Sequence, residues 1–309
     1  MQSCGTAGYG ICWTEFKRSG KARTIGRHRY CLTSVGNCVM SFRGAKMLLF
    51  RLVTTVSALS RVCADTPRTR ETLVVQDSAL ANFFYTDKLL SQFSARSRVH
   101  CMAQCFKNGC CHSFTYNGLQ GTPGRCCCHG TRMLGTLGRS VSVGARTYVR
   151  DFGTVSNVAL LKPSHHSSQW TQSNQLLGPF LAVDNDLSTI LTPDEKCSNT
   201  LAEPGVRSWW QVDLEAYHRV YSIVITNRGD CCGERLRDFD LHLYDQNPMT
   251  NPGAASTLFF HYDGPMEQGV TEEMLPCSPP ITGRFVRLTN TPEEYLTLCE
   301  VQVMADPVN

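Results

Sequence analysis

The segment TNRGDCCGERL, residues 226–236, places two arginines, an acid and two adjacent cysteines close together. Arg228 and Arg235 each offer a planar fork of hydrogen-bond donors that stays charged at physiological pH. Asp230 lies between them and can neutralise and orient one guanidinium. Donors held around an acid suit a neutral ligand rich in hydroxyl oxygens better than they suit a bare anion.

Cys231 and Cys232 could form a disulfide with each other. Adjacent Cα atoms lie about 3.8 Å apart, below the usual disulfide range of about 4.4–6.8 Å, so the ring would be tight and the loop rigid. Separate partners or free thiols are the alternative, and a secreted chain favours the vicinal bridge. The tripeptide Arg228-Gly229-Asp230 also spells a cell-adhesion motif. A rigid loop argues against that use, because such a motif must protrude and move.

Short β-strands must carry this loop, since runs rich in β-branched and aromatic residues fill the carboxy-terminal half. The runs are WWQVDL (209–214), VYSIVIT (220–226), FDLHLY (239–244), STLFFHY (256–262), RFVRLT (284–289) and LCEVQV (298–303). Gly, Pro, Asn and Asp separate them, which favours a β-sandwich or jelly roll over an α/β fold. The loop 227–235 follows the second run and so lies at one end of the sandwich, where binding residues are common.

A smaller, cysteine-rich part precedes the sandwich. The pattern predicts a helix over 97–106 that places Cys101 and Cys105 on one face, one turn apart. CHSFTYN (111–117) alternates as a strand, and a Gly/Pro turn leads to a second strand at the cysteine triplet 126–128. Two disulfides that join the helix to this hairpin would stabilise a segment with little apolar core.

The amino-terminal end is basic. Residues 1–64 hold ten Lys or Arg and one acid, whereas the remaining chain has 20 basic and 25 acidic residues, which disfavours a nucleic-acid partner. Residues 47–64 resemble a signal peptide, with a short buried helix as the alternative. Residues 1–46 are then an unfolded leader, or the true start is Met40 or Met47. No apolar run reaches the roughly 18 residues needed to span a membrane.

Cysteine usage supports secretion. Of the 17 cysteines, five precede residue 65 and twelve follow it, an even number that suits an oxidising compartment and a disulfide framework. No zinc-finger spacing occurs. No pair of positioned carboxylates indicates a glycosidase, and no nucleophile triad is evident. We therefore predict no catalytic residues.

The carboxy-terminal part resembles the F-type lectin (fucolectin) family over about 157–305. The resembling segments, in order, are NVAL (157–160), AVDND (182–186), WWQVDL, SIVITNRGDCCGER, GRFVRL (283–288) and YLTLCEVQV (295–303). The family motif is Arg-x-Asp followed, after four further residues, by Arg or Lys, and Arg228, Asp230 and Arg235 match it. The resemblance implies a jelly-roll β-sandwich that binds L-fucose.

The resemblance also implies roles for single residues. The two arginines would hydrogen-bond the ring oxygen and axial hydroxyl of fucose, and the Cys231–Cys232 disulfide would pack on the sugar. Asn199 occupies the position of a third sugar ligand, which is histidine in the family. Ile190, Leu191 and Thr192 lie in a loop that could form an apolar wall for the sugar methyl group.

A structural Ca²⁺ beside the sugar loops is implied in the same way, with ligand positions at Asp184, Asp186, Cys299 and Glu300. A Cys197–Cys299 disulfide would tether the last of these acids, and carboxylate oxygens suit this ion. A solvated acidic loop without metal is the alternative. Cys277 lacks its family partner, so either a bridge to the first part or to another chain, or a free thiol, remains open.

Residues 65–151 resemble a PAN/apple domain, in which a helix with two cysteines is tied to central strands. Such domains bind proteins or glycans and are not catalytic. We expect a secreted, two-domain lectin for fucosylated or related glycans, with recognition or defence as its family-implied role. Oligomers or a protein partner through the apple-like part would add avidity. The alternatives are a discoidin-like sandwich that binds protein or lipid, or a lectin with shifted sugar specificity.

Overall fold

The computed structural model describes residues 73–86, 88–119, 122–132, 139–172, 175–290 and 294–308. The predicted leader 1–46 and signal peptide 47–64 lie outside these residues. Contacts divide the chain into a unit of residues 1–76 and a unit of residues 77–309. In the described residues, no helix has both the length and the apolar character that a membrane crossing requires.

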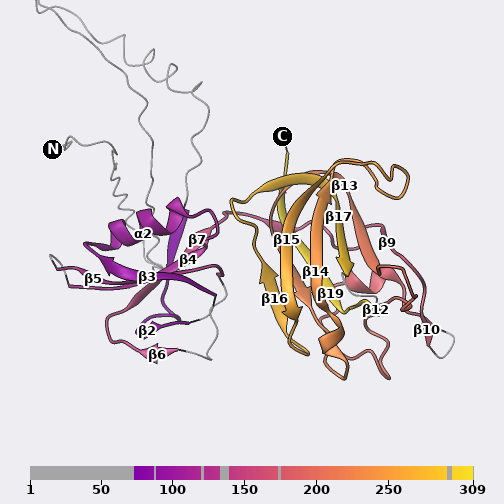
Figure 1. Cartoon of the computed structure of the whole chain (residues 1–309), viewed down its shortest axis with the longest axis horizontal. Coiled ribbons are helices and arrows are strands. Elements are labelled where there is room, and N and C mark those ends of the chain that lie inside the picture. Colours follow the sequence, from indigo (N-terminus) through magenta and orange to yellow (C-terminus); the bar gives the residue numbers. More distant parts are fainter. Residues whose placement is uncertain are drawn as a thin grey trace, which may run out of the picture. The chain divides into compact units, whose positions relative to one another are not determined.

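The first part of the described chain is a small sheet with one helix (Figure 1). Its elements are β1 (Leu73–Asp77), β2 (Phe83–Phe84), β3 (Leu89–Ala95), α2 (Arg98–Lys107), β4 (Ser113–Asn117), β5 (Gly124–His129), β6 (Ser140–Val141) and β7 (Arg146–Asp151). Strands β7, β4, β5 and β3 lie side by side in that order, with antiparallel pairing, and β2 pairs with β6.

The helix α2 confirms the prediction for 97–106 to within one residue. Ser97 is its N-cap, and its side chain accepts a hydrogen bond from the backbone N–H of His100 at 3.2 Å, which satisfies one donor of the first turn. Cys101 and Cys105 both point into the core, because four residues return a helical side chain to the same face. They form disulfides with Cys126 and Cys111, respectively.

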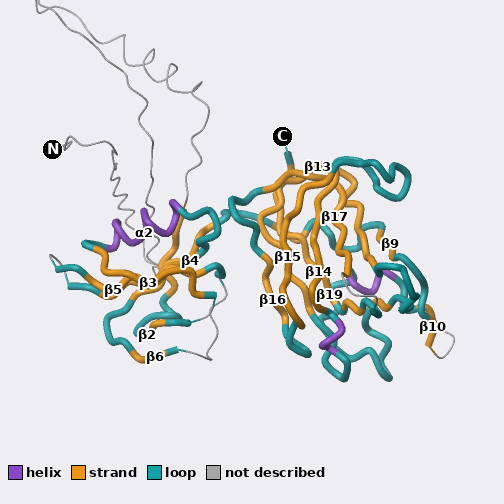
Figure 2. Tube along the Cα trace, viewed as in Figure 1, coloured by secondary structure: helices purple, strands orange, loops and turns teal. Residues whose placement is uncertain are grey.

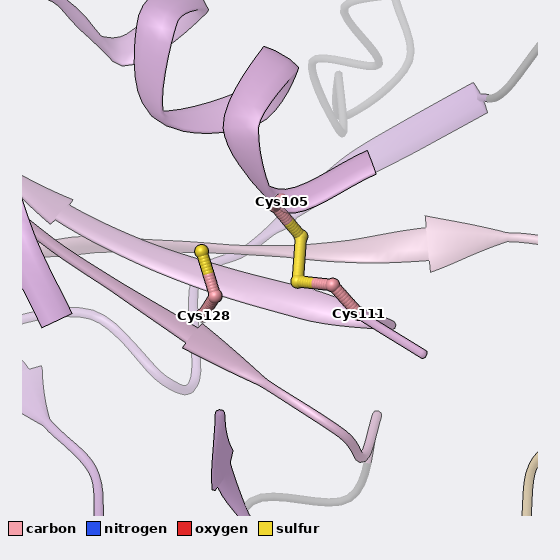
Figure 3. A group of neighbouring side chains, drawn as sticks. All are labelled: Cys105, Cys111 and Cys128. Atoms are coloured by element: carbon pink, nitrogen blue, oxygen red, sulfur yellow. A yellow bond between two sulfur atoms is a disulfide. The ribbon is translucent and has the colours of Figure 1, made fainter. Parts of the chain in front are cut away.

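The cysteine triplet of β5 leaves two thiols free, Cys127 and Cys128, so the even cysteine count after residue 64 does not correspond to full pairing. Successive strand side chains point to opposite faces, so Cys127 faces away from its two neighbours and cannot pair with either. The Cys128 thiol lies 4.0 Å from the sulfur of Cys126 and faces the Cys105–Cys111 disulfide (Figure 3). Burial raises the pKa of both free thiols.

The second part is rich in strands, which Figure 2 shows in orange. Its elements are β8 (Ser156–Asn157), β9 (Ser164–His166), β10 (Thr171–Gln172), β11 (Gln175–Leu176), the 3-10 helix η1 (Pro179–Ala182), β12 (Ser198–Asn199), β13 (Trp209–Thr226), the 3-10 helix η2 (Gly233–Arg235), β14 (Arg237–Tyr244), β15 (Ser256–Pro265), β16 (Thr271–Met274), β17 (Ile281–Asn290), β18 (Thr297–Leu298) and β19 (Glu300–Pro307). The prediction of a mainly-β fold is confirmed, and the arrangement is consistent with the predicted sandwich.

Strand β13 pairs with four other strands of this part. Sequence analysis predicts two strands, 209–214 and 220–226, but the structure contains one strand of 18 residues with an irregularity between Asp213 and His218. Its first half pairs with β17 and β9, and its second half pairs with β19 and β16. The polar stretch between the runs does not interrupt the strand because pairing with β17 resumes at His218.

The core of this part lies between the inward faces of β13, β14, β17 and β19. Trp210, Phe239 and Val286 are buried members, and alternate residues of β14 point inward. The Trp210 indole N–H donates to the carbonyl oxygen of Pro179 at 3.0 Å, so this tryptophan is a core residue. Trp209 is only partly buried, and the guanidinium of Arg287 lies 4.1 Å from its ring centroid.

Cys277, for which the sequence leaves either a bridge or a free thiol open, forms a disulfide with Cys110. The backbone N–H of Ser278 also donates to the carbonyl oxygen of Gly109 at 3.0 Å. This cross-link balances the odd cysteine counts of the segments 65–151 and 157–305. The boundary between these two segments stays a prediction.

Candidate functional site

The loop that leaves β13 is organised by a buried asparagine. Asn227 is 1% exposed, and its side-chain N–H groups donate to the carbonyl oxygens of Gly233, Met266 and Glu267 at 2.9–3.1 Å. Its own side-chain oxygen accepts from the backbone N–H of Arg228 at 2.8 Å. A single amide therefore ties the start of the loop to its end and to the segment that follows β15.

Arg228 and Asp230 form a bidentate ion pair. Nε and Nη2 of the arginine donate to Oδ1 and Oδ2 of the aspartate at 2.8 and 2.7 Å, which leaves Nη1 outside the pair. The backbone N–H groups of Leu191 and Thr192 donate to the same carboxylate at 3.1 and 3.3 Å. These donors, with the arginine first, hold the pKa of Asp230 well below its usual range. The carboxylate therefore stays ionised and aims the guanidinium.

The Arg-Gly-Asp tripeptide is folded inward and does not protrude. The side chains of Arg228 and Asp230 are only 9% and 15% exposed, and they bind each other. The backbone N–H of Gly229 donates to the carbonyl oxygen of Thr189 at 2.8 Å, and a side chain at Gly229 would collide with Thr189. An adhesion motif needs both charges available to a partner, so the structure is against that alternative.

Cys231 and Cys232 are joined in a disulfide, with Cα atoms 3.8 Å apart. Cys232 adopts the left-handed conformation (φ 58°) from which η2 begins. A Cβ added at Gly233 would lie 2.7 Å from the Cα of Gln268, so only glycine allows the close approach of these two segments. The Gln268 side chain in turn donates to the carbonyl oxygen of Gly229 at 2.8 Å, which closes the loop on itself.

Arg235 is the more accessible arginine of the motif. Its side chain is 34% exposed, its Nε lies 3.9 Å from Oε1 of Glu294, and its guanidinium carbon lies 4.9 Å from the ring centroid of Tyr295. Tyr295 makes an edge contact with Trp170, with ring centroids 5.7 Å apart. The chain therefore supplies an aromatic support that steadies this guanidinium while leaving it open to a ligand.

Asn199 lies in β12, opposite Thr297 of β18. It is 6% exposed, and its side-chain oxygen accepts a hydrogen bond from the Thr297 hydroxyl at 2.6 Å. Among the hydrogen bonds described for Asn199, none goes to Arg228 or Arg235. Leu191 is 3% exposed, and its side chain packs beside Cys197 and Cys299. That side chain therefore does not form the predicted apolar wall for a sugar, and Leu191 contributes its backbone N–H, which donates to Asp230.

The acidic loop contains a buried carboxylate. Glu300 is 1% exposed, its Oε1 has no hydrogen-bond partner, and its Oε2 accepts from the backbone N–H of Asn185 at 3.3 Å. Burial, assisted by the nearby charge of Asp184, raises the pKa of Glu300 to about 7. Asp186 forms an ion pair with Lys196 at 3.0 Å. The Cys197–Cys299 disulfide holds the two segments together.

The carboxylates of Asp184, Asp186 and Glu300 do not converge closely. In the part of the chain that the structure describes, the His/Cys/Asp/Glu group whose ligand atoms all lie within 4.8 Å consists of Cys105, Cys111 and Cys128. Two of those sulfurs are joined in a disulfide (Figure 3), so that group offers a single thiol and no metal site.

Sequence reasoning does not identify several residues that shape the site. Asn227 donates to a backbone carbonyl of the loop, Gln268 donates to the loop from a distant segment, and Tyr295 packs its ring against Arg235. None of these interactions produces a recognisable spacing of residues in the sequence. The one usable sign is the position of Asn227, directly before Arg228 at the end of a strand, where a capping amide is common.

Comparison with known proteins identifies relatives of the second part. A family model described as a NedA-like, galactose-binding domain matches residues 181–288. Fucolectin-6 of Anguilla japonica is 36% identical over 141 residues, which cover 44% of this chain and 71% of that protein. Fucolectin-5 of Anguilla japonica is 33% identical over 162 residues, which cover 51% of this chain and 80% of that protein.

One solved structure is the F-lectin (fucolectin) from the serum of the striped bass, Morone saxatilis. It aligns with 50% of this chain at 27% sequence identity and a TM-score of 0.44. The aligned part spans half the length of the striped bass protein.

Proposed function

This chain belongs to the fucolectin family, and we propose that it is a lectin whose Arg228–Arg235 loop binds L-fucose or fucosylated glycans. The family consists of carbohydrate-binding lectin domains and not of enzymes. The observation that carries the proposal is the inward-facing Arg228–Asp230 pair, which fixes one guanidinium in the same loop as the Cys231–Cys232 disulfide and the more accessible Arg235.

The chemistry of the loop suits a sugar. Asp230 neutralises Arg228, so the pair presents directed donors with little net charge, and Nη1 can donate to a hydroxyl or ring oxygen. Arg235 supplies a second fork from the other side of the loop. The sulfur atoms of Cys231–Cys232 offer a soft apolar surface on which the less polar face of a pyranose can pack.

Asn199 is the weakest member of the proposed sugar set, because its side-chain oxygen is already used by Thr297. A shift in sugar specificity on the same arginines is therefore the second candidate. Galactose is the sugar to compare, because the matching family model is described as a galactose-binding domain. A discoidin-like role without sugar binding is the third outcome that the experiment distinguishes.

We propose calcium as a structural cofactor. Its site would comprise Asp184, Asp186, the Cys299 position and Glu300. Glu300 is the member of this set that fits a cation, since it carries a buried, unpartnered Oε1 and a carboxylate that burial makes costly to ionise. A bound divalent ion would stabilise that ionised form and hold the acidic loop in place. The loop matters to the sugar site because Leu191, which follows it in the chain, donates its backbone N–H to Asp230.

Secretion and an apple-like fold for residues 65–151 remain part of the proposal. The disulfides of the described chain suit an oxidising compartment. A helix tied to central strands by Cys101–Cys126 and Cys105–Cys111 is the arrangement that the apple-like interpretation requires. Since single-sugar sites bind weakly, with Kd on the order of micromolar to millimolar, a second module or several copies would supply avidity.

The test is a glycan array probed with the full chain and its Arg228→Ala variant, with calcium and with EDTA. Arg237→Ala is the matched control, because Arg237 lies two residues beyond Arg235 but pairs with the exposed Asp238 at 2.9 Å. We expect fucose-selective binding that is lost in Arg228→Ala and kept in Arg237→Ala. Galactose-selective binding with the same dependence would indicate shifted specificity. Folded protein that binds no sugar would refute the lectin.

A further inference from the structure

The segment before the lectin part differs from it sharply in charge. Residues 77–151 contain nine Lys or Arg against three Asp and no Glu. Residues 152–309 contain nine Lys or Arg against twenty acids. The lectin loop, with its arginine neutralised by Asp230, does not use the basic charge of the first segment. A separate anionic partner for that segment would explain this distribution.

A cavity of about 650 Å³ lies in this basic segment. Its lining comes from the residues before and within the first turn of α2, the end of β4 and the start of β7, and includes Arg96, Ser97, Arg98, Tyr116, Arg146 and Tyr148. The volume falls within the usual range of about 300–1,000 Å³ for small-molecule sites. It is large enough for a disaccharide and much larger than an inorganic ion needs.

Three arginines line this cavity, and none of its lining residues is acidic. Arg98 is fixed in place, because its Nη1 donates to the hydroxyl of Tyr148 at 2.9 Å and its guanidinium carbon lies 5.4 Å from that ring. Arg96 and Arg146 are exposed. In the described contacts, neither of these two side chains has a carboxylate partner. One anchored and two accessible arginines therefore line a common space.

The sheet places these residues on one face by register. Tyr116 of β4 lies opposite Arg146 of β7, and Phe114 lies opposite Tyr148. The rings of Phe114 and Tyr148 stack with centroids 5.0 Å apart, which keeps Tyr148 at 2% exposure beneath Arg98. The floor of the cavity is thus a packed aromatic layer, and its rim is charged. The positive end of α2 adds to the field because Ser97 and the first turn line the same space.

We propose that this cavity binds the sulfate or carboxylate groups of an acidic glycan. Planar guanidinium forks match both groups, and the cavity is large enough to hold the sugar rings that carry them. A free phosphate or sulfate ion would not need the volume or the aromatic floor. This site lies in a different part of the sequence from the fucose loop and does not depend on the function proposed for that loop.

The experiment measures binding of the full chain to immobilised heparin, to hyaluronan, to neutral dextran and to vesicles of anionic phospholipid. The test variant is Arg96→Ala/Arg146→Ala. The control is Lys107→Ala/Arg139→Ala, which removes the same charge from exposed positions outside the cavity lining. Because residues 1–64 carry ten Lys or Arg, the comparison of these two variants, and not the wild-type affinity alone, isolates the cavity.

We expect the test variant to bind the acidic glycan about tenfold or more weakly than wild type, since each lost charge-assisted hydrogen bond costs about that factor. The control should change the affinity by less than about threefold, and dextran should not bind. The heparin and hyaluronan arms identify sulfate or carboxylate as the recognised group. Both variants should keep the wild-type fucose binding and melting temperature.

Three results would overturn the proposal. Equal losses in both variants would mean diffuse attraction without a built site. Absence of binding to heparin and hyaluronan by folded, fucose-binding protein would remove the ligand class. Binding to vesicles of anionic phospholipid with no affinity for either glycan would assign the basic surface to membranes instead. None of these results would contradict the proposal that the Arg228–Arg235 loop binds fucose, so the two proposals can be refuted independently.

Discussion

The Asp230→Asn variant should lose stability because it breaks a buried ion pair. The substituted side chain would keep one acceptor oxygen but would present an amide N–H to a guanidinium that offers only donors. Arg228, whose side chain is 9% exposed, would then be left partly unpaired. One of the two bonds at 2.8 and 2.7 Å is lost outright. A charged hydrogen bond of this kind contributes about 1.5–3 kcal/mol, and a broken buried pair costs about 3–5 kcal/mol.

We therefore expect Asp230→Asn to lower the free energy of unfolding by about 3 kcal/mol and the melting temperature by roughly 6–12 °C. The assay is chemical and thermal denaturation. The matched control is Asp306→Asn, which breaks the Arg219–Asp306 pair with similar distances of 2.8 and 2.9 Å but with side chains 45% and 26% exposed. That change should cost less than about 1 kcal/mol.

The pH dependence provides a second check on the same variant. The folded pKa of Asp230 lies below its ordinary value of 3.8, so its ionised form adds stability that is fully present above that value. This contribution is lost as the pH falls toward the folded pKa. The stability difference between wild type and Asp230→Asn should therefore be constant near pH 7 and shrink below about pH 4. Equal losses for Asp230→Asn and Asp306→Asn at pH 7 would refute the idea that a buried pair organises the loop.

Three further predictions concern the metal, the thiols and the vicinal disulfide. Calcium should raise the melting temperature more at pH 8 than at pH 6, because Glu300, with a pKa of about 7, must lose its proton to bind the ion. The Glu300→Gln variant should show no such rise in melting temperature with calcium. Cys127 and Cys128 should resist thiol reagents in native protein and react with them in denatured, unreduced protein, as read by peptide mass spectrometry. Fast labelling of these two cysteines in the native state would contradict their burial. Cys231→Ser/Cys232→Ser should weaken fucose binding by about tenfold or more if the sulfurs pack on the sugar, and an unchanged Kd by calorimetry would exclude that contact.

The sequence predicts the elements of this fold well where local patterns decide them. The helix with Cys101 and Cys105 follows from a cap residue and a four-residue spacing, and the structure confirms it. The strands of the second part follow from alternating apolar residues. Prediction fails at 215–219, where polar residues suggest a break but β13 continues, because pairing with β17 and β19 on either side is in place from His218 onward. Pairing of this kind joins residues distant in sequence and leaves no local signal.

In the candidate site, too, local sequence motifs are predictable and long-range contacts are not. The spacing of Arg228, Asp230 and Arg235 indicates the loop, because the family motif lies within a few consecutive residues. The support for the loop could not be predicted, because it comes from hydrogen bonds with distant segments. The backbone N–H of Leu191 donates to Asp230, and the side-chain amide of Gln268 donates to the carbonyl oxygen of Gly229. The partner of Cys277 also depends on tertiary proximity to Cys110, which no cysteine count can reveal.

The most direct test of the central claim is a calorimetric titration of L-fucose into the full chain and into Arg228→Lys. Lysine keeps the positive charge but lacks the fork that both binds Asp230 and leaves Nη1 for a ligand. We predict saturable binding to the wild type with a Kd in the micromolar to millimolar range, roughly as expected for a single-sugar site, and no measurable heat with the variant. Fucose binding that is equal in the two proteins, or absent from folded wild type, would contradict the account.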